Sequence, residues 1–244
     1  MDNTMYVALS RQVTLRREMD IIANNIANVD TTGFKVEMPM VRVDESDGAR
    51  MLDGPKTLKF VLDDGVVRDF GQGALRQTGG TFDLAIEGQG FFRVQTDAGE
   101  RYTRDGRFTL APDGRLTTQA GDPVLGDSGE IVVNPEDGPV SISADGVVSQ
   151  NGEQIGKIGV VTFEDLASLS KAGENLMRNT SNLQPVPATA AQVRQGMLET
   201  SNVNSIQQIT RMIEVSRAYE SMARTIEGSS ELSRRSVERL GRVA

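Results

Sequence analysis

The sequence changes character twice along its length, and this change limits what the chain can fold into. Residues 48–159 hold 20 of the 25 glycines, whereas residues 3–28 contain none and residues 204–240 contain one. Asp-Gly and Asn-Gly pairs recur in the glycine-rich part, as at Asn151-Gly152. These pairs favour tight hairpin turns because both residues tolerate positive φ. The sequence therefore predicts two helical ends around a strand-rich insert.

Each helical end is apolar on more than one face. In residues 3–28 a seam at alternating spacings of four and three is interrupted by Gln12 and Arg16, and other apolar residues widen it. In residues 204–240 one stripe consists of Ile206, Ile209 and Ile213, and a second of Met212, Val215, Tyr219, Met222 and Ile226. A helix that is apolar on several faces needs several partners. We expect the two ends to pair with each other and also to self-associate. The alternative is an ordinary α+β monomer whose helices pack on its own sheet.

The expected fold class is α+β. The N- and C-terminal helices pack as an antiparallel, coiled-coil-like pair, and the insert is an antiparallel β-rich domain that forms a meander or an irregular barrel. Residues 164–195 are rich in Ser, Asn and Pro and are expected to form a loop that returns to the second helix. The expected domains are residues 1–36, 37–195 and 196–244.

The composition makes most catalytic and metal chemistry improbable. The chain has no Cys and no His, which removes the commonest metal ligands and the commonest general base. Gly88-Gln89-Gly90 lacks the rest of a dinucleotide fingerprint, and hairpin turns explain the Asp-Gly pairs better than calcium loops. The formal charge is −8, and the acidic excess lies between the two ends. We therefore expect no enzyme, no cofactor, no metal, no small-molecule substrate and no nucleic-acid partner.

Targeting signals are also missing from the pattern. The longest apolar run near the start is residues 6–9, and Asp2 stands where a signal peptide carries basic residues. No segment approaches the roughly 20 apolar residues that a membrane span needs. The expectation is a chain without membrane insertion, which is cytoplasmic or exported without a cleaved signal peptide.

The end of the first helical pattern has an unusual set of amides. Asn24, Asn25 and Asn28 precede a Thr31-Thr32-Gly33 turn. Asn is a poor helix-interior residue because its amide competes for backbone hydrogen bonds. A helix C-terminus with Gly33 at positive φ explains Gly33 and Asn28 but not Asn24 and Asn25. These two side chains are expected to make specific polar contacts, within the subunit or with another chain.

Three long stretches together resemble bacterial flagellar axial proteins of the rod and hook. Residues 23–35 resemble the N-terminal signature of that family, and residues 75–92, continued through 102–108, resemble its central motif. Residues 196–204, followed by Met212-Ile213 and by Arg217 to Glu220, resemble the C-terminal signature. Within the rod proteins, residues 1–12 are most similar to the proximal-rod branch, and the distal-rod branch is the alternative.

The resemblance implies a structural subunit of the rod. Terminal helices of many subunits would form the core of a tube that crosses the periplasm and transmits motor torque, with the β domain outside. The implied partners are other rod subunits, copies of the same chain and the flagellar type III export apparatus. The residues expected to set assembly and register are Asn24, Asn25, Asn28, Thr31, Gly33, Lys35, Ser201, Asn202, Asn204, Ile213, Arg217, Tyr219 and Glu220.

Two readings outside the family remain open from the residues alone. One is a β-rich binding module that dimerises through helical ends. The other is a hydrolase that uses two carboxylates about 5–9 Å apart in a cleft.

Overall fold

The computed structural model describes residues 2–43, 61–181 and 183–240, and these residues form two compact units. The helical unit combines residues 2–27, 37–43, 61–69 and 204–240, and the strand unit combines residues 28–36 and 70–203. The chain therefore passes between the units four times. The domain boundaries expected after residues 36 and 195 stay a prediction.

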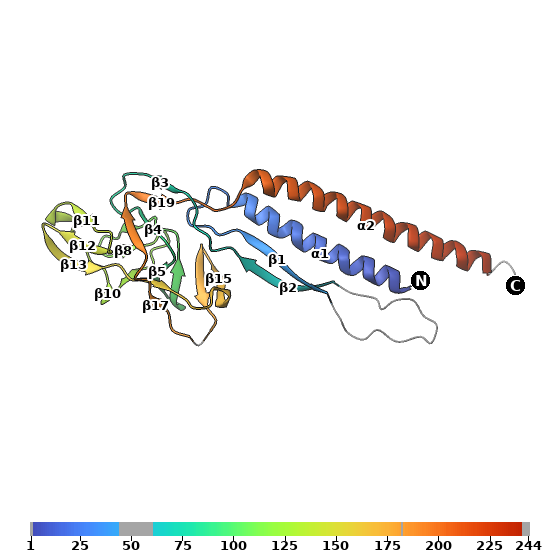
Figure 1. Ribbon diagram of the computed structural model, residues 1–244, viewed down its shortest axis with the longest axis horizontal. Coiled ribbons are helices and arrows are strands. Elements are labelled where there is room, and N and C mark those ends of the chain that lie inside the picture. Colours follow the sequence, from blue (N-terminus) through green and yellow to red (C-terminus); the bar gives the residue numbers. More distant parts are fainter. Residues whose placement is uncertain (1, 44–60, 182, 241–244) are drawn as a thin grey trace. The chain divides into compact units, whose positions relative to one another are not determined.

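Two helices dominate the helical unit, as the periodicity predicted. Helix α1 (Asp2–Ala27) and helix α2 (Ser205–Leu240) lie side by side and run in opposite directions (Figure 1). Asn204 caps α2, because its Oδ1 accepts the N–H of Gln207 at 3.1 Å. The buried contact between the helices consists of Leu15, Ile22 and Val215, with Met19, Ile26, Met212 and Tyr219 packed against it. The second apolar stripe of the C-terminal pattern thus supplies the intramolecular contact.

A β-hairpin completes the helical unit. Strands β1 (Glu37–Val43) and β2 (Val61–Arg68) pair antiparallel and pack against α1. Glu37 is buried and forms an ion pair with Arg68 at 3.0 Å. On the same hairpin Met38, Met40 and Val67 are exposed.

The strand unit consists of several small antiparallel sheets. The largest follows the order β10-β9-β5-β6-β16-β15, with β14 pairing β5 and β17 pairing β14. The smaller sheets are β11-β12-β13, β18-β4, β19-β3 and β7-β8. The strands are β3 (Leu75–Gln77), β4 (Leu84–Glu87), β5 (Phe91–Thr96), β6 (Gly99–Thr103), β7 (Thr109–Leu110), β8 (Leu116–Thr117), β9 (Val124–Gly126), β10 (Gly129–Glu130), β11 (Val140–Ile142), β12 (Val147–Gln150), β13 (Glu153–Lys157), β14 (Val160–Thr162), β15 (Leu169–Gly173), β16 (Leu176–Asn179), β17 (Val186–Pro187), β18 (Gln192–Gln195) and β19 (Met197–Glu199). Short 3-10 turns occupy Pro135–Asp137 and Leu166–Ser168.

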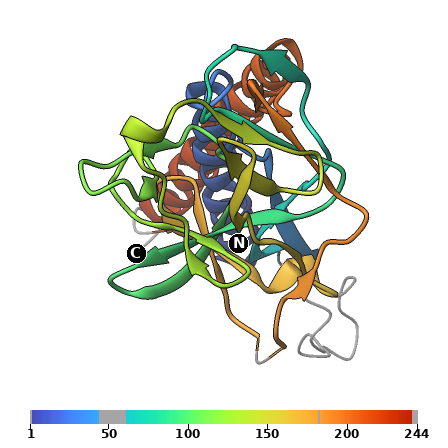
Figure 2. The same cartoon turned by 90° about the vertical axis from the view of Figure 1, so that its left-hand side faces the viewer.

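The α+β class is confirmed, but the expected barrel is wrong. Figure 2 looks onto the strands of this unit, which lie as separate sheets and do not close into a ring. Many strands are only two to four residues long, and a barrel requires strands of consistent tilt and register around a closed circle.

The expected loop at residues 164–195 is also wrong. Strands β15 to β18 lie in this stretch, and β18 pairs with β4 from Gln192 opposite Glu87 to Gln195 opposite Leu84. The turn expected at Asn151-Gly152 does connect two strands, β12 and β13, and both of its residues have positive φ.

Two clusters of buried side chains hold the strand unit together. The larger one gathers Leu84, Ile86, Phe92, Phe108, Leu116, Val124, Ile131, Val133, Val140, Ile142, Val148, Ile158 and Val193. The smaller one gathers Phe91, Tyr102, Val161, Phe163, Leu169 and Met177. Tyr102 and Phe163 form an edge-to-face pair with ring centroids 4.8 Å apart.

The phenol of Tyr102 makes the stability of this smaller cluster depend on pH. Burial, aided by the charge of Glu100, raises the pKa of Tyr102 from 10.0 to about 12. The neutral phenol is therefore favoured in the folded state, so this stabilisation is complete below pH 10 and is lost as the pH rises toward 12. We expect a loss of about 1–2 kcal/mol across this range. Unfolding by urea at pH 9 and pH 11.5 measures the loss, and it should be much smaller in Tyr102→Phe.

Candidate functional site

Asn25 ties together three elements of the helical unit. Its side chain is 1% exposed. Its Oδ1 accepts the backbone N–H of Glu37 at 2.9 Å, and its Nδ2 donates to the carbonyl oxygen of Glu37 at 2.7 Å. The same Nδ2 lies 3.2 Å from Oε1 of Gln208 on α2. The amide thus satisfies both backbone groups at the start of β1, which are otherwise buried away from water.

The asparagines around it lie differently. Asn24 is half-buried on α1. Asn28 begins the strand unit, where its Oδ1 accepts the hydroxyl of Thr31 at 3.1 Å and its carbonyl accepts the N–H of Thr31 at 3.2 Å. Gly33 ends this turn with φ +69° and donates its N–H to the carbonyl of Glu199 at 2.8 Å. The positive φ expected at Gly33 is present.

Lys35 belongs to a buried ion cluster that joins all three family motifs. Its Nζ lies 2.5 Å from Oε1 of Glu199, and Nη1 of Arg104 lies 3.1 Å from Oε2 of the same carboxylate. The three side chains are 1%, 0% and 4% exposed. Lys35 also donates to the carbonyl of Gly71 at 2.8 Å, and Gly73 donates its N–H to Oε1 of Glu199 at 2.9 Å. One carboxylate therefore faces two buried cations.

Arg104 carries the second positive charge. It donates to the carbonyls of Ile86 at 3.3 Å and Gly88 at 2.7 Å, and its guanidinium lies 5.4 Å from the ring centroid of Phe91. Its Nε is buried without a hydrogen-bond partner among the described residues. Burial lowers the pKa of Arg104, and the charge of Glu199 opposes that shift. The position of Arg104 thus depends on Glu199.

The C-terminal signature adds neutral hydrogen bonds to the same place. Asn202 accepts the N–H of Val36 through Oδ1 at 2.8 Å and donates Nδ2 to Gly71 at 3.1 Å. Ser201 accepts the N–H of Val203 through its hydroxyl at 3.2 Å. Thr31, Gly33, Lys35, Ser201 and Asn202 are therefore brought together. The sequence pattern did not single out Arg104 and Glu199. Both lie inside the motifs at residues 102–108 and 196–204, and their opposite charges were the available signal.

The remaining candidates lie on α2 and are not part of this cluster. Ile213 is 48% exposed, and Arg217 is exposed. Tyr219 is half-buried against the core between the helices. Glu220 is exposed and lies 3.5 Å from Arg224, one turn later on α2. Ile213, Arg217 and Glu220 thus face solvent, whereas Tyr219 contributes to the contact between α1 and α2.

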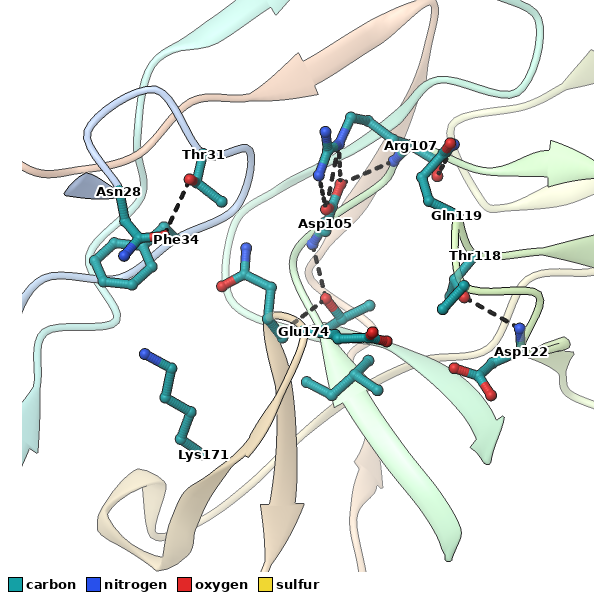
Figure 3. A pocket seen from close by; sticks show the side chains of 14 residues that line it. Asn28, Thr31, Phe34, Asp105, Arg107, Thr118, Gln119, Asp122, Lys171 and Glu174 are labelled. Carbon is teal, nitrogen blue, oxygen red and sulfur yellow. Dashed lines mark hydrogen bonds and ion pairs between the residues drawn. The ribbon is translucent and has the colours of Figure 1, made fainter. Parts of the chain in front are cut away.

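A pocket of about 450 Å³ opens beside the Asn28–Phe34 turn of the strand unit (Figure 3). Lys171 places its ammonium 5.3 Å from the ring centroid of Phe34. Asp105 is engaged by Arg107, whose Nη2 lies 2.6 Å from Oδ2. The pocket therefore has charged walls, but one of its carboxylates is already neutralised by a cation.

Metal-ligand clusters and membrane-spanning helices are both absent from the described residues. Within residues 2–43, 61–181 and 183–240, no group of three or more His, Cys, Asp or Glu side chains could hold a metal ion. In the same part of the chain, neither helix has a stretch long and apolar enough to cross a membrane.

Known families match the chain in three consecutive regions. Residues 5–35 match the flagella basal body rod protein model, residues 85–150 match the flagellar hook protein FlgE/F/G D1 domain, and residues 194–239 match the flagellar basal body rod FlgEFG protein C-terminal model. These matches contain Asn25, Lys35, Arg104 and Glu199.

Curated relatives cover the chain from end to end. The chain is 57% identical to flagellar basal-body rod protein FlgF of Caulobacter vibrioides over 100% of both chains, and 34% identical to FlgF of Mesorhizobium japonicum over 99% of both. It is 34% identical to flagellar basal-body rod protein FlgG of Bacillus subtilis over 94% of this chain and 96% of that one. The chain belongs to the flagellar basal-body rod protein family, in which it is a FlgF-like structural subunit and not an enzyme.

Proposed function

We propose that the chain self-assembles with other rod components through its terminal helices to form the proximal rod of the flagellar basal body. The observation that carries this proposal is the exposed face of α2. Ile206, Ile209 and Ile213 are 76%, 50% and 48% exposed, although they form one stripe at helical spacing. A stripe of three isoleucines in water is unfavourable unless another surface covers it.

Helix α1 supports the same proposal. Leu9 and Val13, one turn apart, are 49% and 60% exposed, while Leu15 and Ile22 are buried against α2. Leu15 and Ile22 are seven residues apart, which is the repeat of a coiled-coil-like pair. Each helix thus has one face for the other helix and a second face for neighbouring subunits, which would be copies of this chain or other rod proteins.

Polar contacts in such a core would set the register of the helices. Packed apolar faces slide at little cost, whereas a buried amide with fixed partners penalises a shifted register. We assign this role to Asn25, whose buried amide has fixed partners on β1 and α2, and extend it to Asn24 and Asn28, which lie beside it in the chain. A register that resists sliding is what a rod needs if it transmits motor torque across the periplasm.

The route to the rod is part of the proposal. The subunit would leave the cell through the flagellar type III export apparatus without a cleaved signal peptide. The relatives named FlgF at 57% identity favour the proximal rod, and those named FlgG at 34% keep the distal rod as the alternative. The position of labelled subunits in purified basal bodies separates the two.

Replacement of the α2 stripe tests assembly directly. In the triple variant Ile206→Ser, Ile209→Ser and Ile213→Ser, we expect the helical content of the purified chain to stay within about 10% of the original, because these side chains face solvent. Incorporation into basal bodies and swimming should be lost. Circular dichroism and immunoblots of purified basal bodies measure the two effects.

The matched control removes exposed apolar surface from the strand unit. Val132→Ser, Ile155→Ser and Leu183→Ser change three side chains that are also exposed. This variant should still be incorporated. Normal incorporation of the α2 variant, or equal loss in both variants, would rule out the α2 stripe as the assembly surface.

A further inference from the structure

The chain crosses between its two units four times. On the strand-unit side, the segments at these crossings are hydrogen-bonded to one another. These segments are residues 28–36, 70–74 and 199–203. Asn202 bonds to Val36 and Gly71, Lys35 bonds to Gly71, and Thr200 donates its N–H to the carbonyl of Ala74 at 2.9 Å. Every segment through which the chain enters or leaves the strand unit is thus tied to another such segment.

Glu199 lies at the centre of this arrangement and comes last in the sequence. Its two carboxylate oxygens bind Lys35, Arg104 and the N–H of Gly73, and its carbonyl accepts the N–H of Gly33. Lys35 and Arg104 precede it by 164 and 95 residues. Until the C-terminal segment returns, these two cations lack the carboxylate of Glu199, which they share in the folded unit. Burial of an unpaired charge costs several kcal/mol, so closure around them is unfavourable before that point.

The returning segment is held by backbone pairing on both sides of the cluster. Strand β18 pairs with β4, and β19 pairs with β3. The last residue of β19 is Glu199, opposite Leu75. The pairing of β19 therefore delivers the carboxylate to the two cations.

We propose that the Lys35–Glu199–Arg104 cluster is a folding latch. The strand unit closes around its two buried cations only when the returning segment brings Glu199, and the four passages of the chain are fixed in that one step. The latch concerns this chain's own folding and holds whether or not the helices assemble as proposed above.

A double-mutant cycle in the full-length chain tests the latch. The deciding result is whether Lys35→Met raises or lowers the stability of Glu199→Gln. Glu199→Gln keeps the shape and removes the carboxylate that the two buried cations share, so we expect a loss of at least about 100-fold in the folding equilibrium constant. Adding Lys35→Met removes one of these cations. The double variant should therefore be more stable than Glu199→Gln alone, by about tenfold or more. Urea unfolding followed by circular dichroism measures both quantities.

Leu198→Ala is the matched control, because Leu198 is buried beside Glu199 on the same strand but carries no charge. It should lower stability through a cavity, and Lys35→Met should not restore any of the loss. If Lys35→Met makes Glu199→Gln less stable, or leaves an unfolded Glu199→Gln chain unfolded, the latch is excluded.

Amide hydrogen exchange provides a second readout. The latch predicts that Glu199→Gln accelerates exchange together at Gly33, Val36, Gly73 and Thr200, each by about 100-fold, while amides in the middle of α1 keep their protection. Acceleration confined to Gly73, whose N–H donates to the altered carboxylate, would reduce the cluster to a local contact and overturn the proposal.

Discussion

Gly33→Ala is expected to destabilise the strand unit by about 4 kcal/mol, a large fraction of the roughly 5–15 kcal/mol by which an ordinary domain is stable. Two costs combine. Gly33 has φ +69°, which an alanine adopts only with strain. A Cβ at this position would also lie 2.4 Å from the carbonyl carbon and 2.6 Å from the carbonyl oxygen of Arg104, and 2.6 Å from the amide nitrogen of Asp105. These are backbone atoms, so no side-chain rotation relieves the overlap. Urea unfolding of the purified variant measures the loss.

Gly79→Ala separates the two costs. Gly79 has φ +76°, close to that of Gly33, but a Cβ there meets no atom within 4 Å. This variant should lose only about 1–2 kcal/mol, from the left-handed backbone alone. Equal losses in the two variants would show that the close approach of the Asn28–Phe34 turn to Arg104 does not contribute to stability. The close packing that places Lys35 beside Glu199 would then not contribute either.

The helices could be predicted because their information is local. The alternating spacing through residues 3–28 and the apolar stripes of residues 204–240 both reflect the repeat of a helix, and Asn is a favoured residue at a helix N-cap, where Asn204 stands. Which of the two apolar stripes of α2 is buried could not be predicted from local sequence. Ile213 is exposed and Val215 is buried because of what packs on each face, and both residues fit a helix equally well.

The strand unit was harder because its pairings span the chain. Val193 pairs with Ile86, and Leu198 pairs with Arg76, across more than one hundred residues each. A stretch rich in Ser, Asn and Pro becomes a strand there because an open edge accepts it, and composition does not report such edges. The barrel was wrong for the same reason, since turn signals identify neighbours in the chain but not which sheets remain separate.

The candidate site was predicted in part. Gly33 and Lys35 lie in a motif whose residues predict a turn. Asn25 was selected because an Asn side chain does not stabilise the interior of a helix. The residues that bond to them could not be predicted from the sequence. Glu199 is one of 34 acidic residues, and nothing in the sequence near it distinguishes a carboxylate that is 0% exposed from one in water.

Asn25→Ala is the second change with a large expected effect, a loss of about 3 kcal/mol in the stability of the helical unit. The substitution leaves both the N–H and the carbonyl of Glu37 without the partner that now satisfies them, and Glu37 is itself buried. Each unsatisfied backbone group costs about 1–3 kcal/mol. We expect fewer basal bodies to carry the variant subunit, since the start of β1 is no longer held to α1. Urea unfolding and immunoblots of basal bodies measure the two effects.

Gln208→Ala decides which of the contacts of Asn25 sets the register. It removes only the bond of Asn25 to α2, at 3.2 Å, and leaves both bonds to Glu37. Because this bond is longer and Gln208 is only half-buried, we expect a loss below about 1 kcal/mol and normal incorporation. Asn25 would then set the register of α1 mainly through its two bonds to the hairpin, with the bond to α2 contributing little. Gln208→Ala could instead match Asn25→Ala in both urea unfolding and incorporation into basal bodies. The contact between the helices would then be the one that assembly requires, and the bonds of Asn25 to the hairpin would not be required.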